Sequence, residues 1–225
     1  ENLMGEVIRG TATDGHKFDL YLAQPNYAAK GGIVLIQETF GVNDHIRSAA
    51  EDFASDGYLV GAPSLFDRIA SNIELERNPE GITRGKGLKE SLGNEHPLFD
   101  ITSTINIVKS AGNVAVIGYC WGGTLAWLSA CQIDGLSAAV SYYGDEVSGL
   151  THMNPKCPTI LHFGENDPFI PLSEVTLFKE MHPDCTVHLY PTGGSFNCQQ
   201  ANNFNLTSSK IALERTMEHL TKYII

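Results

Sequence analysis

The stretch from Val114 to Gly123, Val-Ala-Val-Ile-Gly-Tyr-Cys-Trp-Gly-Gly, carries the clearest indication of chemistry in this chain. It begins with an apolar run that is typical of a buried strand and continues into glycines that are typical of a tight turn. Cys120 lies between Gly118 and Gly122, which gives the pattern Gly-x-Cys-x-Gly. This is the nucleophile-elbow pattern Gly-x-Ser-x-Gly with a thiol in place of the hydroxyl. The pattern predicts that Cys120 is a nucleophile.

A nucleophile elbow needs small residues on both sides, because a sharp turn from strand to helix leaves no room for flanking side chains. The turn also places the N–H of Trp121 at the start of a helix, where it can stabilise a negative charge that develops on oxygen. A dinucleotide-binding fingerprint, Gly-x-Gly-x-x-Gly, is excluded because position 120 is cysteine. A buried cysteine with a purely structural role is the remaining alternative.

Length and composition limit the class of protein. The chain has 225 residues, 42% of them hydrophobic, which suffices for one α/β domain with a large core but not for two ordinary domains. We therefore expect a single domain over residues 1–225. The net charge of −11 and the lack of a basic run disfavour binding to nucleic acid or to an anionic membrane. A small molecule is the expected partner, and the oligomeric state stays open.

The five cysteines include no Cys-x-x-Cys pair and no spacing with histidine that is typical of a metal site. An odd number of dispersed cysteines is expected for reduced thiols. The sequence also shows no signal-like N-terminal segment and no apolar run of 18 residues. The expected location is therefore the cytoplasm.

Predicted strands and helices alternate along the chain, which indicates a mainly parallel sheet covered by helices on both faces. A hairpin about Asp14-Gly15 precedes this alternation. Residues 64–97 lack a long apolar period, and we expect them to form an irregular segment of loop and short helix over the site. The expected strands are 5–11, 17–23, 33–37, 58–62, 114–118, 136–141, 159–163 and 186–190.

A cysteine nucleophile needs a base and a group that orients the base. In α/β-hydrolases the chain order is nucleophile, acid, histidine. Asp167 follows a predicted buried strand, in a loop that two prolines stiffen, and its carboxylate suits the role of the acid. An ordinary turn is the alternative interpretation of Asn166-Asp167-Pro168.

Three motifs extend this pattern along the chain. They are Gln37-Glu38-x-Phe40-Gly41-Val42-Asn43, Gly118-Tyr119-Cys120-Trp121-Gly122-Gly123 and Gly164-x-x-Asp167-x-Phe169-x-Pro171. At these separations they resemble the dienelactone hydrolase family over nearly the whole chain. The resemblance implies an α/β-hydrolase fold, a Cys-His-Asp triad, and hydrolysis of small lactones or esters through a thioester acyl-enzyme. It implies no metal and no organic cofactor.

The resemblance also implies the catalytic roles of three side chains. Carried over by position, Cys120 is the nucleophile and Asp167 is the acid of the triad. Glu38 is the carboxylate that contacts the thiol and helps to switch it between thiol and thiolate. A structural ion pair is the alternative for Glu38, although a carboxylate beside a thiol can take its proton when substrate changes the local field.

Substrate-binding groups follow from the same resemblance. The backbone N–H groups of Trp121 and Thr39 would form the oxyanion hole, and Arg68 would bind the carboxylate of the substrate. A solvated surface position is the alternative for Arg68. Cys198 stands where some family members have a second arginine that binds this carboxylate. An esterase or thioesterase for a neutral substrate therefore remains a further possibility.

The triad histidine of the family is absent from its motif position. The family pattern is Tyr-x-x-Ala/Gly-Gly-His-x-Phe, whereas this chain reads Tyr190-Pro-Thr-Gly-Gly-Ser-Phe196 and is one residue shorter. None of the eight histidines is expected to replace it. Three explanations are open: a modified histidine that the written sequence omits, a deletion made by engineering, or a natural protein that binds without turnover. The last would make the chain a non-catalytic binding protein with the α/β-hydrolase fold.

Overall fold

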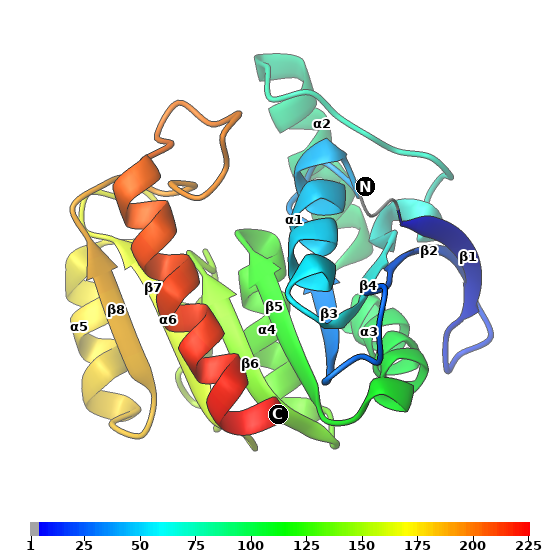
Figure 1. The fold of residues 1–225 in the computed structure, drawn as a ribbon. Helices are drawn as coiled ribbons and strands as arrows, with labels where there is room; N and C mark the ends of the chain where they lie inside the picture. Colours follow the sequence, from blue (N-terminus) through cyan, green and yellow to red (C-terminus); the bar gives the residue numbers. More distant parts are fainter. Residues whose placement is uncertain (1–4) are drawn as a thin grey trace.

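The computed structural model describes residues 5–225 as one central sheet with helices on both faces (Figure 1). The first four residues of the predicted domain lie outside this range. Among the described residues, no helix is long and apolar enough to cross a membrane. The helices are α1 (Asp44–Ser55), α2 (Pro79–Leu92), α3 (Glu95–Val108), α4 (Trp121–Gln132), α5 (Leu172–Met181) and α6 (Leu206–Ile224), with short 3₁₀ turns η1 (Leu65–Arg68), η2 (Lys109–Ala111) and η3 (Val147–Leu150).

The sheet has eight strands in the order β1-β2-β4-β3-β5-β6-β7-β8. Strand β2 pairs antiparallel with β1 and β4, and the other neighbours pair parallel. The predicted hairpin turns at Gly15, whose φ of +87° glycine adopts without steric cost. The mainly parallel α/β sheet is therefore confirmed. The strands are β1 (Glu6–Thr11), β2 (Lys17–Ala23), β3 (Gly32–Ile36), β4 (Leu59–Pro63), β5 (Val114–Tyr119), β6 (Leu136–Tyr142), β7 (Thr159–Gly164) and β8 (Thr186–Tyr190).

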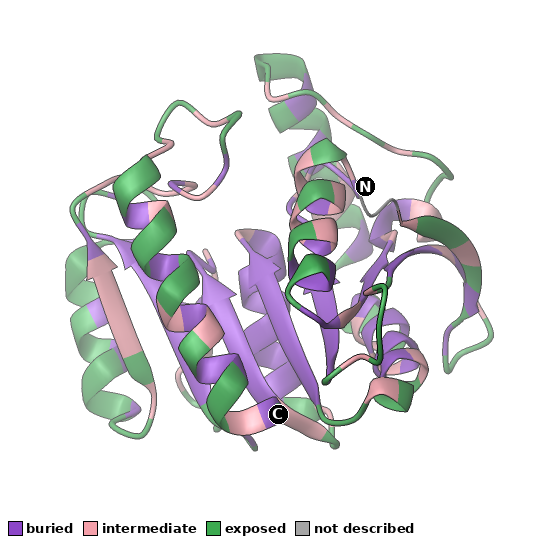
Figure 2. Ribbon diagram, viewed as in Figure 1, coloured by how far each residue is buried: buried purple, intermediate pink, exposed green. Residues whose placement is uncertain are grey.

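The parallel strands β3, β5 and β7 are buried along their whole length, as Figure 2 shows. Helices α1 and α6 cover one face, and α3 and α4 cover the other (Figure 1). The parallel strands point in the same direction, so their carboxyl ends meet at one edge of the sheet. Glu38, Cys120 and Asp167 each follow one of these strands closely. The topology therefore brings the predicted carboxylates and the thiol to the same edge.

Residues 64–97 are more regular than the sequence predicts, because most of them form η1, α2 and the start of α3. Helix α2 begins after Asn78, whose side chain accepts a hydrogen bond of 2.8 Å from the N–H of Gly81. The buried positions of α2 include Gly81 and Gly85, which carry no apolar side chain. The helical period is consequently invisible in the pattern of apolar residues. In Figure 1, α2 lies above the carboxyl edge of the sheet.

Candidate active site

Cys120 occupies a strained turn between β5 and α4. Its backbone angles are φ +54° and ψ −119°, a conformation that residues with a side chain rarely adopt. A Cβ atom on Gly118 would lie 1.8 Å from the carbonyl oxygen of Gly122, and one on Gly122 would lie 2.4 Å from that of Ile36. The close approach of these backbone segments therefore requires glycine on both sides of Cys120.

The turn at Cys120 packs against the end of β3, and α2 packs against the residues that follow β3. The contact of Gly122 with the carbonyl oxygens of Ile36 and Gln37 joins the start of α4 to the end of β3. A Cβ atom on Gly85 of α2 would lie 2.1 Å from the carbonyl oxygen of Thr39. The elbow, the end of β3 and α2 therefore form one packed unit around the segment that includes Thr39.

Burial raises the pKa of the Cys120 thiol to about 12, and the negative charges of Asp145 and Glu38 act in the same direction. The N–H of Trp121 and the ammonium of Lys89 act in the opposite direction. Cys120 is accordingly protonated at neutral pH, although its side chain is partly exposed. A reaction at this sulfur needs a base or a change in the nearby charge.

Glu38 is almost completely buried, with 1% of its surface exposed, and forms an ion pair with Arg77. Its Oε2 accepts a hydrogen bond from the guanidinium, whereas its Oε1 has no hydrogen-bond partner. The guanidinium also lies over the ring of Phe40, 4.4 Å from the centroid. Arg77 is a site residue that the sequence did not reveal, because it lies in the loop before α2 and belongs to none of the three motifs.

Tyr143 is a second residue of the site that the sequence did not reveal. It directly follows β6 and has a positive φ of 40°, and its buried hydroxyl group has no hydrogen-bond partner. Burial raises the pKa of Tyr143, and the charges of Glu38, Cys198 and Cys120 act in the same direction. The tyrosine therefore offers an unused O–H donor close to the carboxylate and the thiols.

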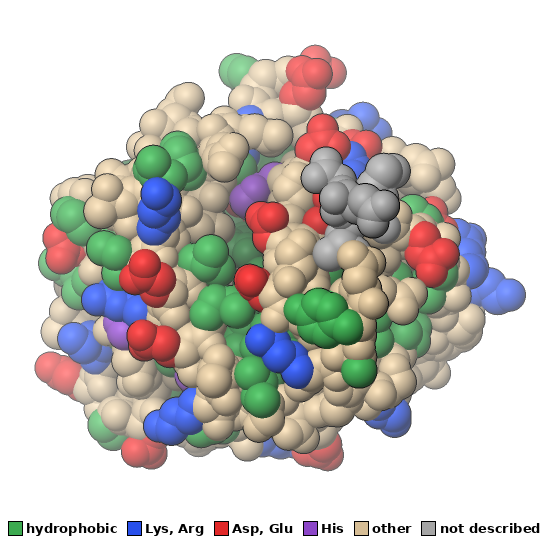
Figure 3. Space-filling model, viewed as in Figure 1, with side chains coloured by type: hydrophobic (Ala, Val, Ile, Leu, Met, Phe, Trp, Pro, Cys, Tyr) green, Lys and Arg blue, Asp and Glu red, His purple; other side chains and the backbone are tan. Residues whose placement is uncertain are grey.

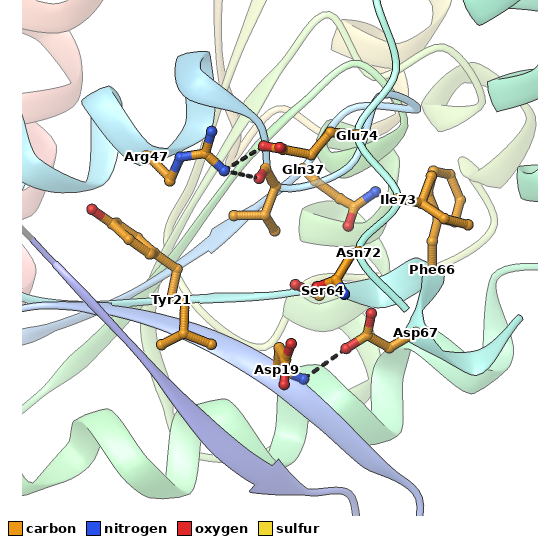
Figure 4. Close-up of a pocket in the computed structure, with 12 residues that line it drawn as sticks. Asp19, Tyr21, Gln37, Arg47, Ser64, Phe66, Asp67, Asn72, Ile73 and Glu74 are labelled. Atoms are coloured by element: carbon orange, nitrogen blue, oxygen red, sulfur yellow. Dashed lines mark hydrogen bonds and ion pairs between the residues drawn. The ribbon is translucent and has the colours of Figure 1, made fainter. Parts of the chain in front are cut away.

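A cavity of about 130 Å³ lies beside the end of β3 (Figure 4). Residues that line it hold the loop that carries Arg77 in place. Arg47 of α1 donates a hydrogen bond of 2.7 Å to the carbonyl oxygen of Val42 and pairs with Glu74. The side chain of Gln37 accepts a hydrogen bond of 3.0 Å from the N–H of Leu65. These contacts join the loop after β3 to the segment between β4 and α2, and they fix the position of that segment.

Arg68, which the sequence predicts to bind a substrate carboxylate, pairs with two carboxylates of the protein itself. Its guanidinium donates hydrogen bonds of 2.8 and 3.0 Å to Asp14, and of 2.8 and 3.1 Å to Asp100. Asp100 is fully buried on α3, and Asp14 lies in the turn between β1 and β2. Because all three guanidinium nitrogens bind these carboxylates, Arg68 joins the hairpin to α3 in this structure.

Asp167 lies in the loop after β7 and accepts a hydrogen bond of 2.9 Å from the N–H of Phe169. A Cβ atom on Gly194 would lie 2.3 Å from Oδ2 of Asp167, so the carboxylate touches the loop that follows β8. In the same loop Ser195 has a positive φ of 57°. Asp167 therefore faces the part of the chain in which the family pattern has its histidine.

Within residues 5–225 no histidine forms a hydrogen bond with Asp167, whose hydrogen-bond donor is the N–H of Phe169. His45 lies near Glu38, one of the predicted site residues. A nitrogen of its ring is within 4.8 Å of the Glu38 carboxylate and of the Cys198 sulfur. Three others are held elsewhere: His162 by Tyr190 and Thr216, His182 by Thr151, and His219 by Pro158.

A nucleophilic side chain at the apex of a turn from a parallel strand into a helix, with an acid after a later strand, is the arrangement of the α/β-hydrolases. The strand order and the backbone of the elbow show this class of fold. Comparison with known families is more specific. The model of the dienelactone hydrolase family matches residues 18–224, and the chain belongs to this family.

Individual relatives agree with this assignment. The chain is 30% identical to a carboxymethylenebutenolidase of a Pseudomonas species, with 98% of this chain and 96% of the relative covered. It is 28% identical to carboxymethylenebutenolidase 1 of Cupriavidus pinatubonensis, with 97% of each chain covered. A crystal structure from Klebsiella pneumoniae that is assigned to the dienelactone hydrolases has a similar fold. Its TM-score is 0.81 at 24% identity, with 97% of this chain and 100% of that chain covered.

Proposed function

We propose that this chain hydrolyses small lactones or esters, with the Cys120 thiol as nucleophile and a thioester acyl-enzyme as intermediate. The observation that carries the proposal is the strained elbow, which presents a partly exposed thiol at the carboxyl edge of the sheet. The names of the relatives denote enzymes that act on a butenolide, which is a lactone. They support a small lactone as the substrate class.

The pair formed by Glu38 and Arg77 supplies a route for activating the thiol. A substrate with a carboxylate would compete with Glu38 for the guanidinium of Arg77. Glu38 would then lose its counter-charge in a buried place, which raises the affinity of its carboxylate for a proton. The free Oε1 of Glu38 can take the proton of Cys120 under these conditions. We therefore assign the recognition of an anionic substrate to Arg77.

The reaction then proceeds in two stages. The thiolate attacks the carbonyl carbon, and the N–H groups of Trp121 and Thr39 stabilise the resulting oxyanion. Collapse of this intermediate breaks the ring C–O bond, the leaving oxygen takes the proton that Glu38 received from Cys120, and the acyl group stays on sulfur as a thioester. Water adds to the thioester, and the acid is released with return of the thiol.

Replacing Cys120 tests this mechanism directly. Cys120→Ala is expected to lower kcat for a lactone by about 10⁴ to 10⁶, because only binding and oxyanion stabilisation remain. Cys131→Ala is a matched control, since that thiol is buried in the same helix that follows the elbow. The intact mass of wild-type protein mixed with an ester should show an acyl adduct that the Cys120 variant lacks. Unchanged activity of Cys120→Ala would contradict the mechanism.

A non-catalytic binding protein is a second candidate function. It is favoured by the surroundings of Asp167. The described loop that this carboxylate contacts, after β8, contains no histidine. A binding protein would form at most a stable adduct at Cys120. Stoichiometric labelling of Cys120 by an ester, without release of acid over many turnovers, would support this candidate over a hydrolase.

We further propose that the protein acts in the cytoplasm on a small molecule, with neither nucleic acid nor membrane as partner. The five cysteines support this location, because all of them are free thiols in the structure. Free thiols are typical of reducing compartments. The net charge of −11 also disfavours polyanionic partners.

A further inference from the structure

Three side chains with metal-binding atoms meet beside the candidate active site: Glu38, His45 and Cys198. A carboxylate oxygen, a ring nitrogen and a sulfur from these residues all lie within 4.8 Å of one another. Glu38 follows β3, His45 belongs to the first turn of α1, and Cys198 lies in the loop between β8 and α6. Such distant positions form no motif, so the sequence by itself does not indicate a metal site.

Two buried polar atoms of this cluster lack hydrogen-bond partners. Oε1 of Glu38 and Nε2 of His45 are both buried without a hydrogen bond. Glu38 is 1% exposed and Cys198 is fully buried. A buried polar atom without a partner destabilises the fold, and native proteins rarely leave one unsatisfied. A cation between these side chains would satisfy both orphaned atoms.

We propose that Glu38, His45 and Cys198 form a binding site for a divalent cation of the zinc class. Nitrogen, sulfur and carboxylate oxygen are the ligands that zinc uses in proteins, and three protein ligands leave one position for water. Zinc lies about 2.0–2.1 Å from nitrogen and about 2.3 Å from sulfur, so small rotations of these side chains complete the site. Binding releases the proton of the Cys198 thiol to solvent.

A hollow between α1 and α6 gives a cation access to the cluster. Its volume is about 420 Å³, and its lining includes His45 and the acidic residues Asp44, Asp52 and Asp56. Figure 3 shows this hollow in the surface, with histidine at its upper end and acidic side chains along one side. Carboxylates lining a concave surface raise the local concentration of cations. The charge of the hollow therefore favours the entry of a divalent metal ion.

Arg77 determines the consequence of binding, because it pairs with Glu38 and its charge also acts on the Cys198 thiol. A bound cation competes with this guanidinium for the carboxylate. Zinc therefore withdraws Glu38 from the activation of Cys120 and inhibits hydrolysis. This inhibition rests on the proposed function, whereas the binding of the ion does not.

Metal binding is measured without any activity assay. Zinc is titrated into the protein in competition with a chromophoric chelator, and cobalt is titrated with detection of its thiolate charge-transfer absorption. We expect one ion per chain, loss of the absorption band in Cys198→Ser, and at least tenfold weaker zinc binding in His45→Asn. Arg77→Met is expected to tighten binding, because a competing positive charge is removed. Cys131→Ser and Cys157→Ser serve as matched controls and should bind as the wild type does.

Several outcomes would overturn the site. They are zinc binding that survives both Cys198→Ser and His45→Asn, loss of the cobalt band in Cys120→Ala, and failure of the wild type to bind zinc. Circular dichroism of each variant reports whether it folds. If a variant does not fold, the melting temperature of the wild type is measured with zinc and with magnesium. Zinc should raise it and magnesium should not. Inhibition of lactone hydrolysis that a chelator reverses is the separate test of the consequence for activity.

Discussion

Arg68 and Arg77 are both paired with buried carboxylates, but only Arg77 lies beside Glu38. We expect Arg77→Met to raise the KM for an anionic lactone by about 10- to 100-fold, which corresponds to the loss of one charge-assisted hydrogen-bonded pair. The KM for a neutral ester of similar size should change much less. Steady-state kinetics with both substrates measure the difference. Equal effects on both substrates would remove Arg77 from substrate recognition and favour a neutral substrate.

Arg68 provides the matched control for this experiment. Arg68→Ala leaves Asp100 buried without a counter-charge, and such a loss destabilises proteins by about 3–5 kcal/mol. We expect a large drop in the urea midpoint of unfolding and little selectivity between anionic and neutral substrates. A selective rise in KM for the anionic lactone would restore Arg68 to the site and contradict the structural role assigned here.

The loop at Gly194 and Ser195 decides whether a base is present. A modified histidine between these residues would raise the intact mass above that of the 225-residue sequence by at least one histidine residue, with the excess in a peptide spanning Tyr190–Phe196. A matching mass would mean that the histidine is absent, and insertion of histidine after Gly194 should then raise kcat by about 10² to 10⁴. The inserted ring would start next to the carboxylate of Asp167.

An alanine inserted after Gly194 is the control for this gain, because it lengthens the loop without adding a base. A protein of matching mass that hydrolyses lactones at an ordinary kcat, on the order of 10 s⁻¹, would contradict two expectations. No modified histidine would be present, and the loss of the histidine would not have lowered the rate. Glu38 would then be the best candidate for the base, since its Oε1 is free.

At the scale of secondary structure, α2 is positioned by glycine rather than by apolar side chains. A Cβ atom on Gly85 would lie 2.1 Å from the carbonyl oxygen of Thr39, whereas one on Gly87 would meet nothing within 4 Å. We therefore expect Gly85→Ala to lower both the melting temperature and the rate of hydrolysis. Displacement of α2 would disturb the N–H donor that Thr39 supplies to the proposed oxyanion hole.

Gly87→Ala in the same helix is the matched control. Because its Cβ atom has free space, the variant should be more stable by about 0.5–1 kcal/mol, the usual gain for replacing glycine inside a helix. Thermal unfolding and kinetics of the two variants test the expected loss of stability in Gly85→Ala and the expected gain in Gly87→Ala. If Gly85→Ala behaved as Gly87→Ala does, close packing of α2 on Thr39 would be refuted.

At the scale of the whole molecule, two neighbouring histidines, the buried His162 and the half-buried His188, make stability depend on pH. Burial lowers the pKa of His188 from 6.5 to about 4 and that of His162 well below its usual range. The two rings are stacked 5.4 Å apart, and Arg215 adds a positive charge that acts on both. Below pH 6.5 the unfolded chain therefore binds more protons than the folded chain does. The contribution of these two histidines to stability therefore falls as the pH falls from about 6.5 to 4.

Urea unfolding between pH 7.5 and 4.5 measures this dependence. His188→Gln removes one of the two groups and should give a flatter decrease of stability in this range. Carboxyl groups whose pKa is raised by burial, such as Asp100 and Asp167, act in the opposite direction. Comparison of the variant with the wild type separates the histidine contribution from theirs. An unchanged slope in His188→Gln would show that this ring does not titrate as proposed.

Local sequence patterns determined most of the fold of this protein and the position of its proposed nucleophile. The glycines around Cys120 and the turn at Asp14-Gly15 act over a few residues, so the chain shows them directly. Alternating apolar strands and helices indicated the parallel sheet for the same reason, because both periods are short.

Only the tertiary structure decided which charged groups meet. The pairing of Glu38 with Arg77 rather than with a motif residue depends on two loops that pack together at the end of β3. The extent of helix α2 was not predicted, because its buried face includes glycine, and a pattern of apolar residues cannot show such a face. The cluster of Glu38 with His45 and Cys198 joins positions far apart in the chain. Contacts of this kind depend on shape and distance after folding, and no short spacing in the sequence encodes them.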